Sequence, residues 1–433
     1  MFKLSNLDIN IKNHLVIGGC DTVELAEQYG TPLYVMDEEQ IRNNMRAYKN
    51  AIDRFYDGNG MALYASKALS AMYMYKLASE EGLGVDVVSG GELYTALKAG
   101  FDAKNIYFHG NNKSRDEIKM AVENGVGTMV ADSAYELDII DSVAAQLGKK
   151  QDIMFRIKPG VEAHTHEFIS TGQIDSKFGF SIENGEADEI ADYASKLENI
   201  NVKGIHCHIG SQIFELEPFC LAAKVMTEYY IKLKRKFGLP LSCLDLGGGF
   251  GISYTSKDKP VEYEKYIEAV SRVIKDICKA NDTELPYILM EPGRSIVGDA
   301  GITLYTIGNI KDIKGVRKYV SIDGGMADNP RYILYDAEYD GVLANRAGDK
   351  ADDIVTVCGK CCESGDIIMK DAHLPMANTG DILAVMSTGA YNYSMASNYN
   401  RIPKPPVIMV KEGKSKVAVK RETYEDIIKN DVI

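Results

Sequence analysis

The sequence predicts an α/β fold in which a (β/α)8 TIM barrel is followed by a C-terminal all-β sandwich or barrel domain. Eight short apolar runs each end in a polar or glycine-rich tip, and their lengths suit strands. They span 61–67, 84–89, 106–110, 127–133, 152–159, 202–210, 241–249 and 287–294. Stretches with helical spacing separate them, and regular strand–helix alternation builds a parallel sheet. Eight such units over about 230 residues suit a closed barrel, whose chemistry lies at the C-terminal strand ends.

Local patterns also predict the elements before the barrel and the connections within it. Residues 1–30 indicate a loop and a short helix, 31–39 a strand that joins the later β domain, and 41–55 an amphipathic helix. Most of the connecting helices end at glycine, which tolerates the left-handed conformation after a helix. These helices are predicted at 71–82, 90–100, 114–125, 133–148, 186–197, 221–238 and 261–280. The connection 160–181 is far longer than an ordinary βα loop, so we expect a lid at the catalytic face.

The pattern changes after Gly298, where strand-like runs alternate with turns rich in Gly, Asp, Asn and Pro. The chain has 433 residues, more than one barrel needs, which agrees with a second domain. We therefore expect a barrel domain over 38–297 and a discontinuous β domain made of 1–37 and 298–433.

Composition and charge exclude several classes of function. Hydrophobic residues make up 45% and charged residues 26% of the chain, which is ordinary for a soluble enzyme. A net charge of −13 argues against nucleic acid or an anionic membrane as the main partner. We see no signal peptide and no run long enough to span a bilayer, so we expect a cytoplasmic protein. The eight cysteines are scattered, and Cys358 with Cys361 forms a lone C-x-x-C, so we expect no metal site.

Lys67 ends the first barrel strand and would point into the barrel mouth. Desolvation there lowers the pKa of a lysine, and only the neutral amine attacks a carbonyl carbon to form a Schiff base. The alternative is a solvated surface lysine.

The loops after strands seven and eight are rich in glycine. Barrels often hold a phosphate group there, because glycine lets backbone N–H groups approach the ligand and an arginine adds charge. The residues concerned are Gly247, Gly248, Gly249, Gly251, Gly293 and Arg294, with Ser211 after strand six as a further hydroxyl donor. Both loops together favour a phosphate site over simple turns.

Glu291 and His208 would complete a cofactor site at the same strand ends. A buried carboxylate needs a partner, which for Glu291 is either a protonated pyridine nitrogen or an arginine such as Arg294 or Arg156. We expect His208 to stack on a flat ring, and we leave His206 as a core or supporting residue. Asp86 also ends a strand and could support these groups. A lysine, a phosphate cradle, a carboxylate and an aromatic platform together indicate pyridoxal 5'-phosphate.

These motifs resemble those of the fold-type III pyridoxal-phosphate-dependent decarboxylases, which share an alanine racemase-like fold, and within them the members that act on diaminopimelate. The resemblance covers nearly the whole chain. YASKA implies that Lys67 binds the cofactor covalently, HIGSQ implies roles for His208 and Ser211, and DLGGGFGISY places Gly248 and Gly249 at the phosphate. EPGRS implies Glu291 at the pyridine nitrogen, with Gly293 and Arg294 near phosphate and substrate. The predicted lid is similar to the active-site loop of that family.

The resemblance also implies the substrate-binding residues. DGGMADNPRYILY places Arg331 and Tyr335 at the substrate, and GAYNYSMASNYN places Tyr391 at both cofactor and substrate. CCESGD implies that Cys362 and Glu363 enter the site from a partner subunit, and hence a homodimer with shared active sites. An arginine can clamp a carboxylate bidentately, and a glutamate can take an ammonium group.

The activity implied is decarboxylation of meso-2,6-diaminopimelate to L-lysine and CO2, the last step of lysine biosynthesis. Cys362 or Lys67 would return the proton to the α-carbon. The alternatives are an ornithine, arginine or lysine decarboxylase of the same fold, an amino-acid racemase, a non-catalytic pyridoxal-phosphate-binding protein, and a phosphate-binding barrel without cofactor.

Overall fold

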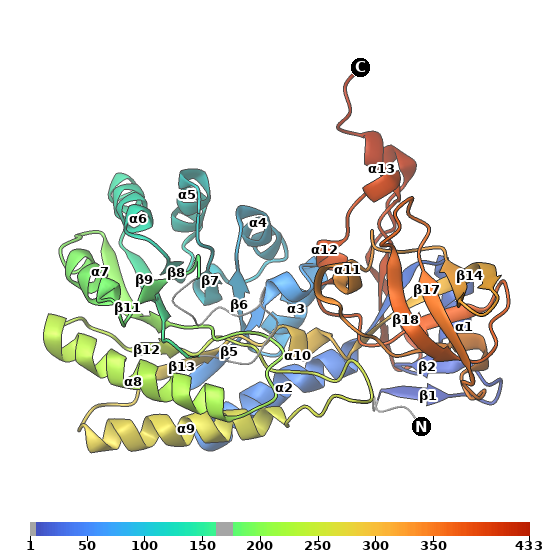
Figure 1. The fold of residues 1–433 in the computed structure, drawn as a ribbon. Helices are drawn as coiled ribbons and strands as arrows, with labels where there is room; N and C mark the ends of the chain where they lie inside the picture. Colours follow the sequence, from blue (N-terminus) through green and yellow to red (C-terminus); the bar gives the residue numbers. More distant parts are fainter. Residues whose placement is uncertain (1–5, 162–175) are drawn as a thin grey trace. The chain divides into compact units, whose positions relative to one another are not determined.

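The computed structural model describes residues 6–161 and 176–433 and divides into two compact units, which we describe separately (Figure 1). The barrel unit consists of 44–251 and 260–293, and the β unit of 1–43, 252–259 and 294–433. The lid predicted at 160–181 lies largely outside the described residues. In the ranges that the structure describes, no helix is both long and apolar enough to cross a membrane.

The barrel unit contains a closed barrel of eight parallel strands, as the sequence predicts. The strands are β5 (Gly60–Ala65), β6 (Gly84–Val87), β7 (Ile106–Phe108), β8 (Thr128–Ala131), β9 (Gln151–Lys158), β11 (Ile200–His206), β12 (Cys243–Asp245) and β13 (Tyr287–Met290). Each pairs with the next, and β13 returns to β5 with Met290 opposite Ala62. The fold class predicted from the strand–helix alternation is therefore confirmed.

The helices that connect these strands surround the barrel (Figure 1). They are α2 (Glu38–Phe55), which leads into β5, and then α3 (Met72–Glu80), α4 (Gly90–Lys98), α5 (Arg115–Asn124), α6 (Ala134–Gln146), α7 (Glu186–Ala194), α8 (Glu217–Phe237) and α9 (Tyr263–Ala280). Ser89, Ser114 and Ser133 cap α4, α5 and α6 by accepting hydrogen bonds from backbone N–H groups of the first turn. Helices α5 and α8 end at Gly125 and Gly238 in the left-handed conformation, as their sequences predict.

Side chains fill the inside of the barrel. Leu63, Val130, Met154 and Leu289 come from β5, β8, β9 and β13, are fully buried and pack in one cluster. The barrel is therefore a packed core, and the loops at its C-terminal edge are left to form a site.

A buried ion pair joins the loop after β7 to α6. Lys113 Nζ lies 2.6 Å from Glu136 Oε1 and also donates to the carbonyl oxygens of Gly110 and Val130, at 2.8 and 2.9 Å. Burial lowers the pKa of Lys113 and raises the pKa of Glu136, while the contact between them opposes both shifts. Each group therefore needs the other to remain charged inside the protein.

The β unit is built around the long strand β14 (Gly301–Ile313), and its main sheet runs in the order β18-β17-β15-β14-β4-β20-β21. This sheet and its branch also contain β4 (Leu33–Asp37), β15 (Arg317–Ile322), β16 (Gly341–Leu343), β17 (Asp353–Cys358), β18 (Ile367–Leu374), β19 (Ile382–Val385), β20 (Val407–Lys411) and β21 (Lys414–Val419). Three short strands, β1 (Leu7–Ile9), β2 (Leu15–Ile17) and β3 (Cys20–Asp21), form a separate sheet before α1 (Thr22–Tyr29), where the sequence predicts a loop and then a short helix. The N-terminal strand β4 pairs with both β14 and β20, as expected for the strand predicted at 31–39. Along β14, Ile302 and Leu304 enter one apolar cluster and Tyr305 and Ile307 another, so both faces of this strand are covered.

Strand β18 was not predicted from the sequence. Its burial does not alternate regularly, because both Lys370 and Asp371 are exposed. Asp371 adopts a positive φ of 51°, and the register against β17 shifts at this point. A bulge of this kind interrupts the period-two pattern by which strands are predicted.

We predict that Lys113→Met lowers the free energy of unfolding by about 3–5 kcal/mol, because it leaves Glu136 buried without its cation. Urea denaturation followed by circular dichroism measures the change. Lys119→Met is the matched control, since Lys119 is an exposed residue of α5 in an ion pair with Glu123 and should contribute less than about 1 kcal/mol. Equal stabilities of the two variants would contradict a structural role for the buried pair.

Candidate active site

The C-terminal edge of the barrel brings together eight of the predicted site residues. Because all eight strands are parallel, residues that end different strands meet at one edge. Lys67 and Asp86 end β5 and β6, His208 and Ser211 follow β11, Gly248 and Gly249 follow β12, and Glu291 and Gly293 follow β13. The structure therefore brings these eight residues to one edge of the barrel, and their role as a site remains a prediction.

Glu291 is held by two histidines. His109 Nε2 lies 2.7 Å from Glu291 Oε1, and His206 Nε2 lies 3.2 Å from Oε2. The two imidazole rings meet edge to face, with centroids 4.8 Å apart, and all three side chains are buried. Burial raises the pKa of Glu291, but the contacts with His109 and His206 outweigh burial and leave that pKa well below its ordinary value.

His206 is a neutral donor to the carboxylate of Glu291. Burial lowers the pKa of His206 to about 4, so the ring carries no proton charge at neutral pH. A neutral imidazole can donate an N–H to a carboxylate without cancelling its charge. A buried carboxylate favours a cation at the same place, such as a protonated ring nitrogen.

Asp245, at the end of β12, lies beside Glu291, and its pKa is shifted in the opposite direction. Burial, together with the charge of Glu291, raises the pKa of Asp245 well above its ordinary value. Its Oδ1 accepts the N–H of Gly247 at 2.8 Å. Donor atoms of Asp245, Glu291, His109 and His206 lie within 4.8 Å of one another, and among the described residues this is the one group that could hold a metal ion. The raised pKa of Asp245 favours its uncharged form, which adds no second negative charge beside Glu291.

His208 presents a neutral ring close to Lys67. Burial lowers the pKa of His208 well below its ordinary value, and the charges of Lys67 and Arg156 add to this effect. The ring nitrogen Nδ1 accepts the N–H of Gly248 at 3.3 Å, which fixes the ring at the mouth of the barrel. Lys67 itself is exposed in the short 3-10 helix Ser66–Ala68, and its charge also acts on buried Asp86. A flat neutral ring and a lysine amine therefore lie at one edge.

The glycines after β12 and β13 allow the strand ends to approach closely. A Cβ atom on Gly248 would lie 2.1 Å from the carbonyl oxygen of Glu291, and one on Gly293 would lie 2.9 Å from Ala65 Cβ. Gly249 has a φ of +111°, a conformation that other residues rarely adopt. Without side chains here, backbone N–H groups remain accessible to an anion such as phosphate.

The β unit contains a second group, which we call the tyrosine–arginine cluster: the predicted residues Arg294, Arg331 and Tyr391 together with Tyr254. Arg294 begins α10 (Arg294–Val297) and Arg331 begins α11 (Arg331–Tyr335). One Nη atom of each arginine donates a hydrogen bond to the hydroxyl of Tyr254, at 2.6 Å for Arg331. The ring of Tyr391 lies 4.8 Å from the Arg294 guanidinium and 5.7 Å from that of Arg331. Tyr391 has a φ of 68°, which is strained for a non-glycine residue.

This cluster carries buried positive charge. Arg294 and Arg331 are only 7% and 6% exposed. Burial raises the pKa of Tyr254, but the two guanidinium groups outweigh burial and lower that pKa overall. Among the residues that the structure describes, Arg331 forms no ion pair with a carboxylate. Such an arrangement is suited to binding an anion.

The remaining predicted residues lie around or apart from this cluster. The ring of Tyr335 lies 5.8 Å from the guanidinium of Arg331. Cys362 and Glu363 are exposed on the loop between β17 and β18, where the N–H of Cys362 donates to Asn400 and Glu363 accepts from the N–H of Gly365. Within the β unit, four of the predicted residues therefore lie together: Arg294, Arg331, Tyr335 and Tyr391. The other two, Cys362 and Glu363, are exposed on the surface.

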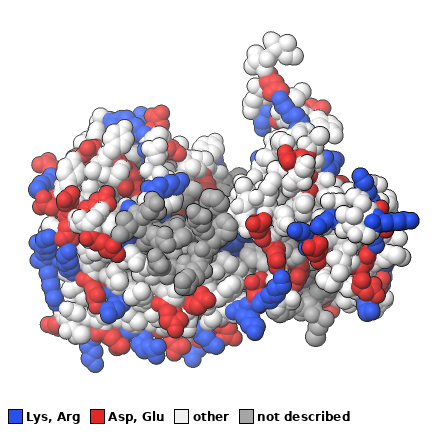
Figure 2. All heavy atoms as spheres, in the orientation of Figure 1, with Lys and Arg blue, Asp and Glu red and all other residues white. Residues whose placement is uncertain are grey.

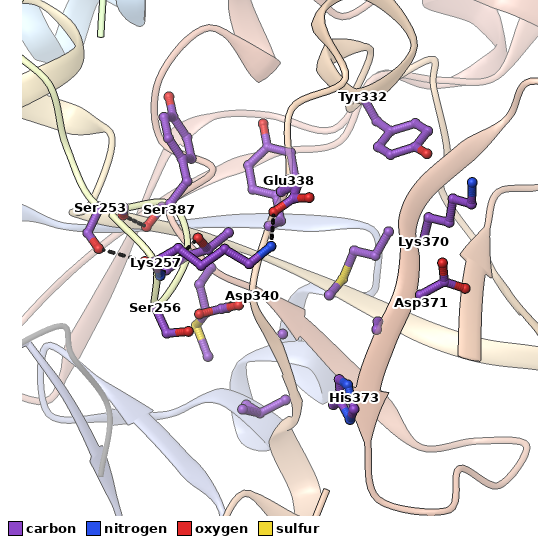
Figure 3. Close-up of a pocket in the computed structure, with 18 of the residues that line it drawn as sticks. Ser253, Ser256, Lys257, Tyr332, Glu338, Asp340, Lys370, Asp371, His373 and Ser387 are labelled. Atoms are coloured by element: carbon purple, nitrogen blue, oxygen red, sulfur yellow. Dashed lines mark hydrogen bonds and ion pairs between the residues drawn. The ribbon is translucent and has the colours of Figure 1, made fainter. Parts of the chain in front are cut away.

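A pocket of about 790 Å³ lies in the β unit beside Tyr254 and Tyr339, which contribute to its lining (Figure 3). Its rim is polar, and the ion pair between Lys257 Nζ and Glu338 Oε2, at 2.9 Å, crosses it. None of the residues predicted as site residues lines this pocket.

On the face shown in Figure 2, acidic and basic side chains are interspersed over the barrel unit.

Three residues of these two groups were missed in the sequence: His109, Asp245 and Tyr254. His109 and Asp245 lie at strand tips, where a search for polar residues would have found them. Tyr254 closes the motif DLGGGFGISY but follows no strand, and only its contacts reveal it. His206, left open as a core or supporting residue, directly contacts Glu291.

We predict a pH dependence of stability that can be traced to His206. As the pH falls below about 6.5 the unfolded chain protonates this residue, whereas the folded protein resists protonation until about pH 4. The unfolded state then binds more protons, so stability decreases over this range, by about 3 kcal/mol from this group. His206→Gln cannot titrate, and urea denaturation between pH 7 and 4 should show a correspondingly smaller loss. Equal losses in both proteins would contradict the prediction.

Comparisons with known proteins agree with this geometry. Residues 38–298 match the model of the pyridoxal binding domain of pyridoxal-dependent decarboxylases. The chain is 51% identical over 422 residues to diaminopimelate decarboxylase of Bacillus methanolicus, covering 98% of both chains, and 49% identical to that of Bacillus subtilis (strain 168), covering 98% and 96%. The crystal structure of diaminopimelate decarboxylase from M. jannaschii with L-lysine has a TM-score of 0.92 at 36% identity, over 100% of this chain and 99% of that one. The chain therefore belongs to the diaminopimelate decarboxylase family of pyridoxal-dependent decarboxylases.

Proposed function

We propose that this protein catalyses the pyridoxal-phosphate-dependent decarboxylation of meso-2,6-diaminopimelate to L-lysine and CO2, the last step of lysine biosynthesis. The observation that carries the proposal is the ionised, buried Glu291 at the same barrel edge as Lys67 and His208. Enzymes named diaminopimelate decarboxylase share about half of their residues with this chain over nearly its full length. This similarity supports diaminopimelate as the substrate.

The residues at the barrel edge fit pyridoxal phosphate. Glu291 would hold the ring nitrogen in its protonated form, His208 would stack on the ring, and Lys67 would bind the cofactor covalently. The phosphate would lie against the glycine-rich turns with the hydroxyl of Ser211, and the other residues proposed for the cofactor are Asp86, Gly248, Gly249, Gly293, Arg294 and Tyr391. When bound, the cofactor accepts the electron pair that remains when the carboxylate leaves as CO2.

The residues of the β unit would bind the substrate. Diaminopimelate keeps an ammonium and a carboxylate at the end far from the reacting carbon. The buried charges of Arg294 and Arg331 suit this carboxylate, with Tyr335 and Tyr391 beside them, and Glu363 would bind the ammonium. Cys362 or Lys67 would deliver the proton that replaces the lost carboxylate.

We further propose that the protein works as a cytoplasmic homodimer with shared active sites. Cys362 and Glu363 are exposed on their own chain, which suits residues that complete the site of a partner subunit. The β domain, predicted at 1–37 and 298–433, would then supply residues for substrate binding and for the dimer interface. All eight cysteines are free thiols, as expected for a reducing compartment.

The alternatives explain less of the site. Ornithine, arginine and lysine have no second carboxylate, so a decarboxylase acting on them would have no use for the buried guanidinium group of Arg331 at the substrate. A non-catalytic pyridoxal-phosphate-binding protein would need the barrel but not the β unit.

Lys67→Ala should remove the visible imine band of the bound cofactor and abolish activity, because the covalent link is lost. Spectra of the purified protein from 300 to 500 nm, taken after loading with pyridoxal phosphate, measure this change. Lys76→Ala, an exposed residue of α3 in an ion pair with Glu80, is the matched control. A Lys67→Ala protein that keeps both absorbance and activity would overturn the assignment.

Product analysis tests which amino acid the protein decarboxylates. The loaded protein is incubated separately with meso-diaminopimelate, ornithine, arginine and lysine, and the products are identified by mass spectrometry. We expect lysine from diaminopimelate and no amine from the other three. Putrescine, agmatine or cadaverine would instead identify one of the alternative decarboxylases.

A further inference from the structure

Tyr254 connects two residues proposed for the substrate, although it belongs to no element of the barrel or the sheet. It lies in the segment 252–259, which follows the glycine-rich turn after β12 and packs within the β unit. Its side chain is buried, and its hydroxyl accepts hydrogen bonds from both Arg294 and Arg331. The proposed reaction assigns no role to Tyr254.

The hydroxyl group of Tyr254 can still donate one hydrogen bond. A tyrosine hydroxyl has two lone pairs and one proton. The two arginines occupy both lone pairs of Tyr254, so its own O–H remains to donate. An anion bound at Arg294 and Arg331 can therefore accept from the tyrosine as well, and a carboxylate has enough lone pairs for all three donors.

The surrounding rings keep Tyr254 in this position. Its ring lies 5.0 Å from the guanidinium of Arg331 and 5.5 Å from that of Arg294, within the range of cation–π attraction. The ring of Tyr339 meets it edge to face, with centroids 5.6 Å apart. Two buried cations near one another repel, and an oxygen accepting from both offsets part of that repulsion. Tyr254 thus holds two arginines that would otherwise separate.

We propose that Tyr254 is a positioning residue that joins Arg294 and Arg331 into one carboxylate-binding site and selects ligands that keep a carboxylate far from the reacting carbon. The identity of the substrate rests on the proposed function. The site requires only a carboxylate, so it can be tested with two ligands that differ only in that group.

The experiment compares lysine with cadaverine on the holoenzyme by isothermal titration calorimetry. The two ligands have the same chain and amines, and only lysine has a carboxylate. Tyr254→Phe keeps the ring and removes the hydroxyl. We expect the Kd for lysine to rise about tenfold to a hundredfold, as for loss of hydrogen bonds to charged groups, and the Kd for cadaverine to change less than about twofold. In kinetics with diaminopimelate, KM should rise by a similar factor while kcat stays nearly constant.

Tyr339→Phe is the matched control. It removes a neighbouring buried hydroxyl whose partner is Asn392 rather than an arginine, so lysine should bind to it as to the unaltered protein. An unchanged Kd for lysine in Tyr254→Phe would overturn the proposal, as would equal weakening of lysine and cadaverine. If the unaltered protein prefers lysine to cadaverine but makes no lysine from diaminopimelate, the proposed function fails while the carboxylate site stands.

Discussion

The barrel unit depends on one buried negative charge. An ionised carboxylate inside a protein is costly unless several groups solvate it, and Glu291 has His109 and His206 on its two oxygens and the carboxyl of Asp245, whose pKa is raised, beside it. These groups come from the ends of β7, β11 and β12, while Glu291 follows β13. The closed parallel barrel is what brings them together, so the chemistry of the site depends on the closure of the sheet.

The groups around the carboxylate of Glu291 determine which ligand the site favours. An imidazolium ion at His206 would offset the charge of Glu291. Burial keeps His206 neutral and raises the pKa of Asp245 well above its ordinary value, which favours the uncharged form of that carboxyl. The glycine turns beside it leave backbone N–H groups accessible. An anion-binding turn next to a cation-binding carboxylate suits a ligand with a phosphate at one end and a basic ring nitrogen at the other.

The β unit has the opposite electrostatics. Two buried arginines donate hydrogen bonds to the hydroxyl of Tyr254, and within the described residues Arg331 forms no ion pair with a carboxylate. A buried guanidinium group is costly without an anionic partner, so the charge of Arg331 favours an anion at this place.

The amino-acid sequence by itself determined the local structure and the chemical inventory. The strands and helices of the barrel, their glycine ends and the strand at 31–39 follow from short-range patterns, because apolar periodicity and capping act between neighbours in the chain. Lys67, His208 and Glu291 could be predicted because parallel strands place their C-terminal ends together. Strand β18, by contrast, could not be predicted, because a bulge with two successive exposed residues interrupts the alternation of buried and exposed side chains. Only the tertiary structure decided which groups touch: that His109 and His206 hold Glu291, that burial beside Glu291 raises the pKa of Asp245, and that the hydroxyl of Tyr254 accepts from both Arg294 and Arg331. These properties arise from burial and from distances between residues far apart in the chain, and no local pattern encodes either.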